Sequence, residues 1–408
     1  MHLPTNYRRI LPILLLTTFI TILLWSNRRT VKETVEETWH DLPQTIGLGD
    51  SIEDDDPSTS ASRIAPSTFQ PGQTKPNGEN YTRILVIPRT SQENISWVSE
   101  HLPELQTAVY TVDKPSGDLR VPKNKGHEVM VYLTYVIDFY NKLPDISIFM
   151  HAHRKAWHNN DLLGLDAVQM LQRLSSPRIV REGYVNLRCH WDPGCPDWIH
   201  PGATSANSVK QEQTLVASSW GELFPLDPIP KVLGAPCCAQ FAVSKERIRS
   251  IPLEKYKHLR DWLMRTKLRD SMSGRVFEYL WHYVFSGQSV MCPAMHVCYC
   301  DLYGLCFGGT NEFDKYFELR YNLENHQKEL KEWKAKEKLV LQAKENGRFD
   351  EAMPLEVPEL GRDMWLDHEI KTIKLDMEAR LNGAKEAGKD PEIRAKEAGR
   401  EWREGDGF

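Results

Sequence analysis

The chain has 408 residues, of which 40% are hydrophobic, and it contains twelve tryptophans. This length and composition provide enough apolar surface for one large domain or two, and they exclude a wholly disordered protein. The formal net charge is only −5, and the sequence has no basic stripe interleaved with aromatic residues. We therefore expect no nucleic-acid partner.

An apolar segment, residues 10–25 (ILPILLLTTFITILLW), carries no charge and has arginines on both sides. As a helix it would be about 24 Å long, close to the thickness of a thin bilayer. No small-residue cleavage site follows Trp25, which favours an uncleaved signal anchor over a cleaved signal peptide or a buried helix. We predict a single-pass type II protein of the Golgi or another secretory compartment, with residues 1–9 as a cytoplasmic stub.

Two features indicate that the rest of the chain is lumenal. Asn80 (N-Y-T) and Asn94 (N-I-S) are acceptors for glycosylation in that compartment. All eight cysteines lie between Cys189 and Cys306, and an even set in a lumenal domain indicates disulfides, although their connectivity cannot be deduced. Residues 26–79 are rich in acids, Pro, Ser and Thr, and we interpret them as a disordered stem.

Strand and helix patterns alternate at the start of the folded region, residues 80–308. We expect strands at 83–87, 107–112 and 145–153, with Pro88 ending the first, and helices at 95–105 and 126–143. This alternation predicts an α/β fold, a doubly wound and mostly parallel sheet with helices on both faces. In such sheets ligands bind beyond the carboxyl ends of the strands.

Residues 182–240 are irregular and rich in Pro, Gly, Cys and Trp, which predicts disulfide-rich loops. A strand at 241–244, a helix from Lys245 and a helical stretch over 273–285 follow. The tail, residues 309–408, is dense in Lys and Glu, as in ELKEWKAKEKL. This pattern predicts solvated helices with i,i+4 ion pairs, or alternatively a partner-binding coiled coil.

The segment DISIFMHAHRKAWHNND, residues 145–161, contains the densest group of candidate site residues. These are His151, His153, Arg154, Trp157, His158 and Asp161. Side chains two apart on a strand share a face, so His151 and His153 can converge on one ligand. With His158 or Asp161 they could hold a divalent metal such as Mn or Zn. A direct polar contact with substrate, or simple structural hydrogen bonding, are the alternatives.

Residues 124–128 (NKGHE) open the predicted helix at 126–143. Asn124 is a candidate N-cap, and free N–H groups at a helix start attract anions such as phosphate. We therefore include Asn124, Gly126, His127 and Glu128 as candidate substrate-binding residues, with plain capping as the alternative.

A candidate general base lies in the helical stretch at 273–285. On one helix Glu278 and His282 would be i,i+4 neighbours, and a carboxylate beside an imidazole suits proton transfer. The alternative is that Glu278 only pairs with Arg275.

Three segments of the chain, in order, resemble a mostly fungal family catalogued as domain of unknown function 3431. They are VPKNKGHEVMVYLTYVIDFYNKLPDISIFMHAHRKAWHNND, PCCAQFAVSKERIRSIP and SGRVFEYLWHYVF, and the resemblance covers residues 83–307. It implies a membrane-anchored or secreted protein, supplies no reaction, and supports the choice of Gly126, Glu128, His151, His153, Trp157 and His158.

A more distant resemblance is to doubly wound glycosyltransferases that use nucleotide sugars. An anchor, a stem and a lumenal α/β domain are their usual layout, and QFAVSKERI is similar to an acceptor-side segment of some of them. Where such enzymes carry Asp-x-Asp, this chain has His151-Ala152-His153. The resemblance implies a sugar transfer in which these histidines contact a metal or donor phosphate, with Glu278 or Asp161 as base.

Two other classes of function fit the same sequence. One is a metal-dependent hydrolase that activates water with His151, His153 and either His158 or Asp161. The other is a non-catalytic lumenal binding or scaffold protein in which the charged C-terminal helices are the working part.

Overall fold

The computed structural model describes residues 72–76, 78–114, 118–202, 213–345, 358–404 and 407–408. The predicted cytoplasmic stub and signal anchor, and the stem up to residue 71, lie outside these residues. Within the described ranges, no helix is both long enough and apolar enough to cross a membrane.

The centre of the molecule is a sheet of five strands in the order β2-β1-β3-β5-β4. The strands are β1 (Arg83–Arg89), β2 (Gln106–Thr111), β3 (Ile146–Phe149), β4 (Tyr184–Asn186) and β5 (Phe241–Ser244). β1 pairs in parallel with β2 and β3, whereas β5 is antiparallel to both β3 and β4. β4 therefore runs in the same direction as β3. The predicted mostly parallel α/β sheet is confirmed, with β5 as the described strand that runs the other way.

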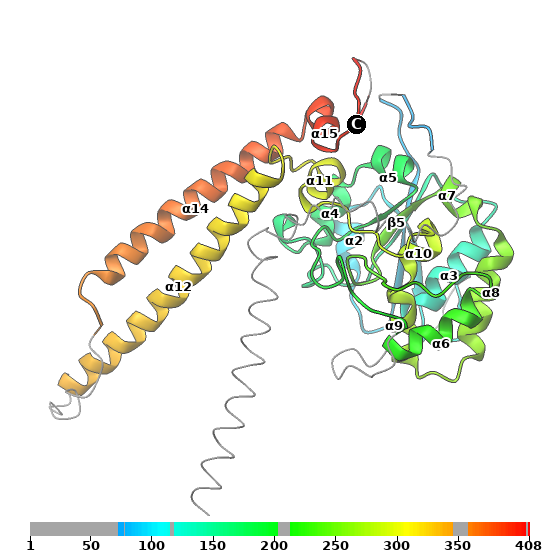
Figure 1. Ribbon diagram of the computed structural model, residues 1–408, viewed down its shortest axis with the longest axis horizontal. Helices are drawn as coiled ribbons and strands as arrows, with labels where there is room; N and C mark the ends of the chain where they lie inside the picture. Colours follow the sequence, from blue (N-terminus) through cyan, green and yellow to red (C-terminus); the bar gives the residue numbers. More distant parts are fainter. Residues whose placement is uncertain (1–71, 77, 115–117, 203–212, 346–357, 405–406) are drawn as a thin grey trace, which may run out of the picture.

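Helices cover both faces of this sheet (Figure 1). They are α2 (Ser96–His101), α3 (Glu128–Phe139), α4 (Ala167–Arg173), α5 (Ser176–Glu182), α6 (Gln213–Leu223), α7 (Lys245–Ser250), α8 (Leu253–Arg265), α9 (Asp270–Glu278), α10 (Trp281–Ser286), α11 (Met295–Val297), α12 (Thr310–Glu345), α14 (Arg362–Ala387) and α15 (Pro391–Glu397), with a 3₁₀ turn η3 (Asp161–Leu163) and a π-helix η4 (Cys298–Leu302).

Two hydrophobic cores lie on the two faces because side chains alternate along each strand. Val86 and Phe149 face the core formed with α3, α6, α8, α9 and α10. Leu85 and Ile148 face the core formed with α4, α5, η4 and the start of α12. Both faces of the sheet are therefore buried. Polar groups can reach solvent or a ligand at the two ends of the strands.

The structure corrects four sequence expectations about these elements. The strand expected at 145–153 ends at Phe149, so His151 and His153 lie in the loop after β3 and do not share a strand face. β1 continues through Pro88 to Arg89, because a proline is tolerated in a strand where its missing N–H is not required by a neighbour. β4 forms within residues 182–240, which were expected to be irregular. The helical stretch at 273–285 is broken, since α9 ends at Glu278 and α10 begins at Trp281.

The expected disulfides are confirmed, and all eight cysteines are paired. Cys189–Cys298 and Cys195–Cys292 connect segments that are 109 and 97 residues apart. Cys237–Cys238 joins two adjacent residues, and Cys300–Cys306 closes a loop directly after η4. The two long-range bonds fasten the loops after β4 to the segment that leads into η4.

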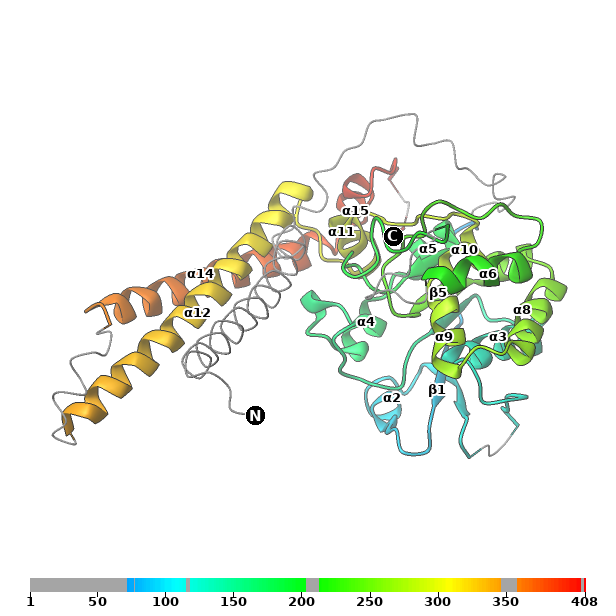
Figure 2. The ribbon, with the colours of Figure 1, turned by 60° about the horizontal axis from the view of Figure 1, so that its bottom comes forward.

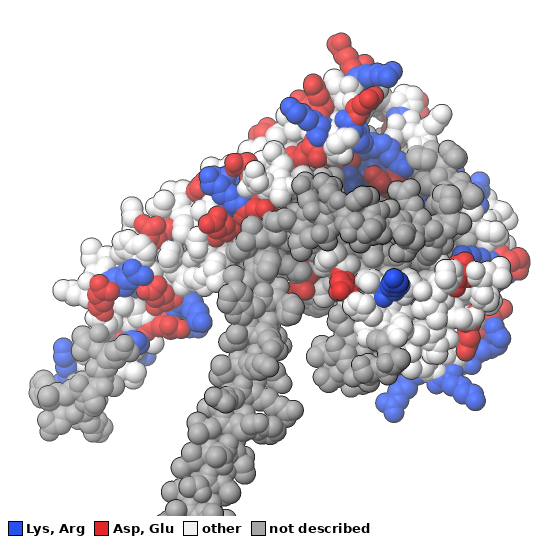
Figure 3. Space-filling view, in the orientation of Figure 1, with Lys and Arg blue, Asp and Glu red and all other residues white. Residues whose placement is uncertain are grey.

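The tail forms a hairpin of two long helices, α12 and α14, that extends away from the sheet domain (Figures 1 and 2). The base of α12 is anchored, because Phe313 and Phe317 are buried in the core on one face of the sheet. Farther out, Leu330 packs against Leu366 and Ile370 of α14. Basic and acidic side chains mix along the visible face of the hairpin (Figure 3), as expected for solvated helices.

Candidate functional site

Polar side chains gather where β1, β2 and β3 end. After β1, the main-chain N–H and hydroxyl of Ser91 donate to the Asp113 carboxylate that follows β2. After β3, His153 Nε2 lies 3.5 Å from Glu93 Oε1 of the β1 loop, and His153 is exposed. The three loops are thus tied together at the carboxyl edge of the sheet, the edge at which ligands bind in open α/β folds.

His151 is held by a buried polar network directly after β3. Its main-chain N–H donates to Gln240 Oε1 at 3.3 Å, and Gln240 Nε2 donates to Asn159 Oδ1 at 3.1 Å. Its ring Nε2 donates to the carbonyl of Cys238 at 2.8 Å, which leaves the lone pair on Nδ1. Burial lowers the pKa of His151, so the ring is neutral at neutral pH.

The turn at Cys237–Ala239 connects His151 to Glu278. Cys238 and Ala239 have φ of 87° and 49°, a left-handed backbone that is strained for residues with a Cβ. In this conformation the Cys238 carbonyl accepts from His151, while its N–H donates to Glu278 Oε1 at 3.1 Å. The backbone of Cys238 therefore holds the His151 imidazole and the Glu278 carboxylate beside each other.

Glu278 lies close enough to a second carboxyl, that of Glu128 at the start of α3, for the charge of Glu128 to act on Glu278. Burial raises the pKa of Glu128 to about 7. Burial, followed by the charge of Glu128, also raises the pKa of Glu278. Glu278 keeps some exposure to solvent. A partly exposed carboxyl with a raised pKa is a candidate for proton transfer.

The expected Glu278–His282 pair is wrong. The break between α9 and α10 removes the i,i+4 relation, and His282 is buried at 1% exposure with its Nε2 bonded to the carbonyl of Ser289. The imidazole next to Glu278 is instead His151, which is distant in sequence.

The segment before α3 is built differently from the expected N-cap. The helix begins at Glu128, and its N-cap residue is His127 rather than Asn124, which is exposed. The Gly126 N–H donates to Asp270 Oδ1 at 2.5 Å, so a carboxylate of the protein occupies the position expected for an anion. A Cβ on Gly274 would lie 2.8 Å from His127 Cδ2, so only glycine lets α9 pack against this turn.

His158 and Trp157 lie beside His151. The ring centroids of His151 and His158 are 5.0 Å apart, and burial lowers the pKa of His158 to about 4. Its Nε2 is buried and has no hydrogen-bond partner among the described residues. Trp157 is 63% exposed, and Arg188 stacks over its ring and donates to its carbonyl.

Asp161 and Arg154 are both engaged by other parts of the chain. Asp161 Oδ2 is 2.7 Å from Arg320 Nη1 of α12 and 3.6 Å from His190 Nε2. Arg154 donates a bidentate pair of hydrogen bonds to the Asp166 carboxylate, and this contact fixes the loop after β3. The Asp161 carboxylate is therefore occupied by its contact with α12.

The described residues contain one group of three metal-type ligand atoms within 4.8 Å of one another: Cys300, Cys306 and Glu397. Its two cysteines form a disulfide, so their sulfurs are not thiolate ligands. Metal binding by His151 and His153 stays a prediction. Of the donors near them, His158 Nε2 and His151 Nδ1 offer neutral imidazole nitrogen, the ligand that zinc accepts.

Three residues of the site were not predicted from the sequence: Glu93, Cys238 and Gln240. Gln240 could have been recognised as a polar residue directly before a buried strand, since such residues need a partner. The other two act through neighbours that only folding supplies. The predicted glycosylation residues Asn80 and Asn94 are both exposed.

These features define an α/β protein with a carboxylate–imidazole site at the carboxyl edge of its strands. Residues 85–301 match the family described as "Protein of unknown function (DUF3431)", and the chain belongs to this family. The match confirms the resemblance found in the sequence and includes Glu128, His151 and Glu278. No curated protein and no solved structure matches the chain.

Proposed function

We propose that the protein is a glycosyltransferase-like enzyme of the secretory pathway in which Glu278 is the general base. The observation that carries this proposal is the position of Glu278. It lies at the carboxyl edge of the sheet, beside His151 and Glu128, with a raised pKa. A carboxylate of raised pKa is a stronger base than an ordinary carboxylate.

In the proposed reaction, Glu278 accepts the proton of an acceptor hydroxyl as its oxygen bonds to the anomeric carbon of the donor sugar. The bond from that carbon to the donor diphosphate breaks, and the diphosphate leaves with the bonding electrons. His151 is held in one tautomer by Cys238, so it can contact the donor through Nδ1. The exposed face of Trp157 offers a surface on which a sugar ring can stack.

The first experiment screens the full chain, secreted from a eukaryotic host so that its disulfides form, against nucleotide sugars with and without Mn²⁺. A donor that binds should raise the melting temperature in a saturable way. Release of the nucleotide then reports turnover. If no nucleotide sugar stabilises the protein, the proposal fails.

The second experiment tests the base. Glu278→Gln should lower the turnover rate by about 10²- to 10⁴-fold with little change in melting temperature. Glu246→Gln, on the exposed start of α7, is the matched control and should leave the rate unchanged. Full activity of Glu278→Gln would contradict the assignment.

A metal-dependent hydrolase is the second candidate, supported by the neighbouring rings of His151 and His158 and by the electrostatic interaction of both with His153. An imidazole-bound metal would supply an activated water. Metal analysis of the purified protein separates the two candidates: one bound ion per chain that is lost in His151→Ala favours the hydrolase. Metal-free protein from a metal-replete preparation eliminates it.

A further inference from the structure

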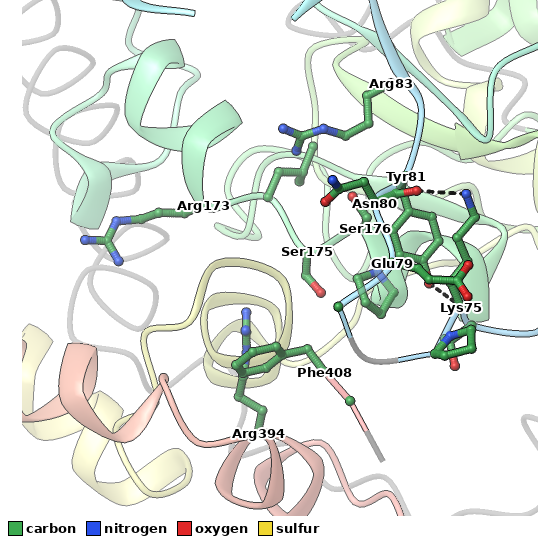
Figure 4. Close-up of a pocket in the computed structure, with 16 residues that line it drawn as sticks. Lys75, Glu79, Asn80, Tyr81, Arg83, Arg173, Ser175, Ser176, Arg394 and Phe408 are labelled. Atoms are coloured by element: carbon green, nitrogen blue, oxygen red, sulfur yellow. Dashed lines mark hydrogen bonds between the residues drawn. The ribbon is translucent and has the colours of Figure 1, made fainter. Parts of the chain in front are cut away.

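A second polar pocket lies at the opposite edge of the sheet, where β1 begins (Figure 4). Its volume is about 400 Å³, and it is bordered by residues 74–76, 78–81 and 83, the end of α4, the start of α5, Arg394 and Phe408. Its charged lining residues are Lys75, Glu79, Arg83, Arg173 and Arg394. The lining therefore has four cations and one acid.

One of these cations is balanced by a neighbour. Lys75 Nζ lies 2.7 Å from Asp145 Oδ2, and Lys245 also contacts this carboxylate at 3.2 Å. Arg83 is different, because its Nη1 contacts a carbonyl, that of Leu171, at 3.5 Å. Figure 4 shows Arg83 and Arg394 on opposite sides of Ser175, whereas the guanidinium of Arg173 extends away from them.

Arg394 belongs to a group of four arginines around one buried carboxylate. Asp301 is 1% exposed and receives Arg178 at 2.6 Å, Arg181 at 3.2 Å and Arg400 at 3.0 Å. The guanidinium of Arg394 donates instead to the carbonyls of Cys300 and Asp301.

The charges in this group do not balance. Arg181 also donates to the main-chain oxygen of Phe408, and even if that oxygen is counted as a full negative charge, four guanidinium groups face two. Buried charges are costly unless they are paired. Arg394 is the member of this group that lines the pocket, so the surplus of positive charge lies directly behind that part of its wall.

Two further observations point the same way. The Nε atoms of Arg181 and Arg400 are buried and have no hydrogen-bond partner among the described residues. Burial, followed by repulsion from the three other arginines, lowers the pKa of Arg394 to about 10 despite the attraction of Asp301. An anion in the pocket would relieve this repulsion.

We propose that this pocket binds a small molecule that carries a phosphate or sulfate group, with Arg83 and Arg394 facing the oxyanion. Arginine is the side chain best suited to such groups, because its planar N–H donors match two oxygens at once. Ser175 and Tyr81 supply hydroxyl groups for the rest of the ligand. The volume suits a monosaccharide with one such group, and the proposal is independent of the function proposed for the other edge.

The test is calorimetric titration of the full chain with inorganic phosphate, inorganic sulfate, glucose 6-phosphate and glucose 6-sulfate at constant ionic strength. Asn80→Gln is included in every protein so that no glycan enters the pocket. Saturable binding of at least one probe is expected, and the better of the two sugar esters identifies the oxyanion. If no probe binds in a saturable way, the proposal is overturned.

Variants then locate the binding. Arg83→Gln should weaken it by about tenfold or more, the loss expected for one charged hydrogen bond. Arg265→Gln, at the end of α8, is the control and should bind like the parent protein. Arg394→Gln should abolish binding if it folds; if it does not, Arg83→Gln decides alone. Unchanged affinity in a folded Arg83→Gln protein would contradict the proposed site.

Discussion

Glu278 and Asp301 are carboxyls with opposite surroundings. Glu278, at the carboxyl edge of the sheet, accepts a backbone N–H and lies near a second carboxyl, so its pKa is raised. Asp301, in η4, is contacted by three arginines, and these lower its pKa despite its burial. The first arrangement leaves a group ready to take a proton, whereas the second fixes a permanent charge that holds helices together. Four predictions test this contrast, beginning with the largest expected effect.

The two nested disulfides that fasten the segment around η4 should contribute most to stability. Cys189–Cys298 and Cys195–Cys292 close loops of 109 and 97 residues, and replacing all four cysteines by Ala should lower the free energy of unfolding by at least about 5 kcal/mol. The matched control is Cys300→Ala with Cys306→Ala, which opens a loop of six residues and should cost about 2 kcal/mol. Urea denaturation measures both, and equal losses would show that loop length does not govern them.

Asp301→Asn should have the next largest effect. It removes the negative charge from a site with three arginines, and breaking a buried pair in this way costs about 3–5 kcal/mol. Asp376→Asn, which breaks an exposed i,i+4 pair with Arg380, should cost less than about 1 kcal/mol. If the two variants unfold at the same urea concentration, Asp301 does not have the structural role inferred here.

Glu128→Gln should change how stability depends on pH. Because the pKa of Glu128 rises from 4.5 to about 7 on folding, the folded state binds the extra proton, and stability falls as the pH rises from about 4.5 to about 7. The variant lacks this dependence and should be more stable than the parent above pH 7 by about 3 kcal/mol. Melting temperatures between pH 4 and pH 8 give the comparison, and parallel curves would mean that the pKa of Glu128 is not raised.

The smallest effect is expected for the ion pair that ties the hairpin to the sheet domain. Arg320→Ala removes the 2.7 Å contact with Asp161, whose carboxylate is 27% exposed, and should cost about 1 kcal/mol. Glu324→Gln, which removes only the i,i+4 partner of Arg320, should cost a few tenths of that, about 0.3 kcal/mol. A loss above about 3 kcal/mol for Arg320→Ala would place Asp161 with Asp301 as a structural carboxylate.

Much of the fold could be predicted because the signals for it are local. β5 at residues 241–244 and the start of α7 at Lys245 follow from a short apolar run and from Ser244, whose hydroxyl accepts from the N–H of Arg247. The sequence is less informative about elements whose existence or ends depend on contacts between residues far apart in the chain. β4 has only three residues and forms because β5 provides its partner.

The candidate site shows the same division. The placement of His151 at the end of a strand could be predicted from residues 145–161, because a β-branched and apolar run leads directly into it. Its partner could not, since Glu278 is 127 positions away and the connection passes through the strained backbone of Cys238.

The sequence by itself determined the α/β class, the strand that presents His151, the even set of cysteines and the family, because each depends on neighbouring residues or on the order of short motifs. Tertiary structure alone decided which carboxyl groups lie beside an opposite charge and which do not. Glu128 and Asp301 are the same kind of group in the sequence, and their pKa values move apart only because folding buries one beside another carboxyl and the other among arginines.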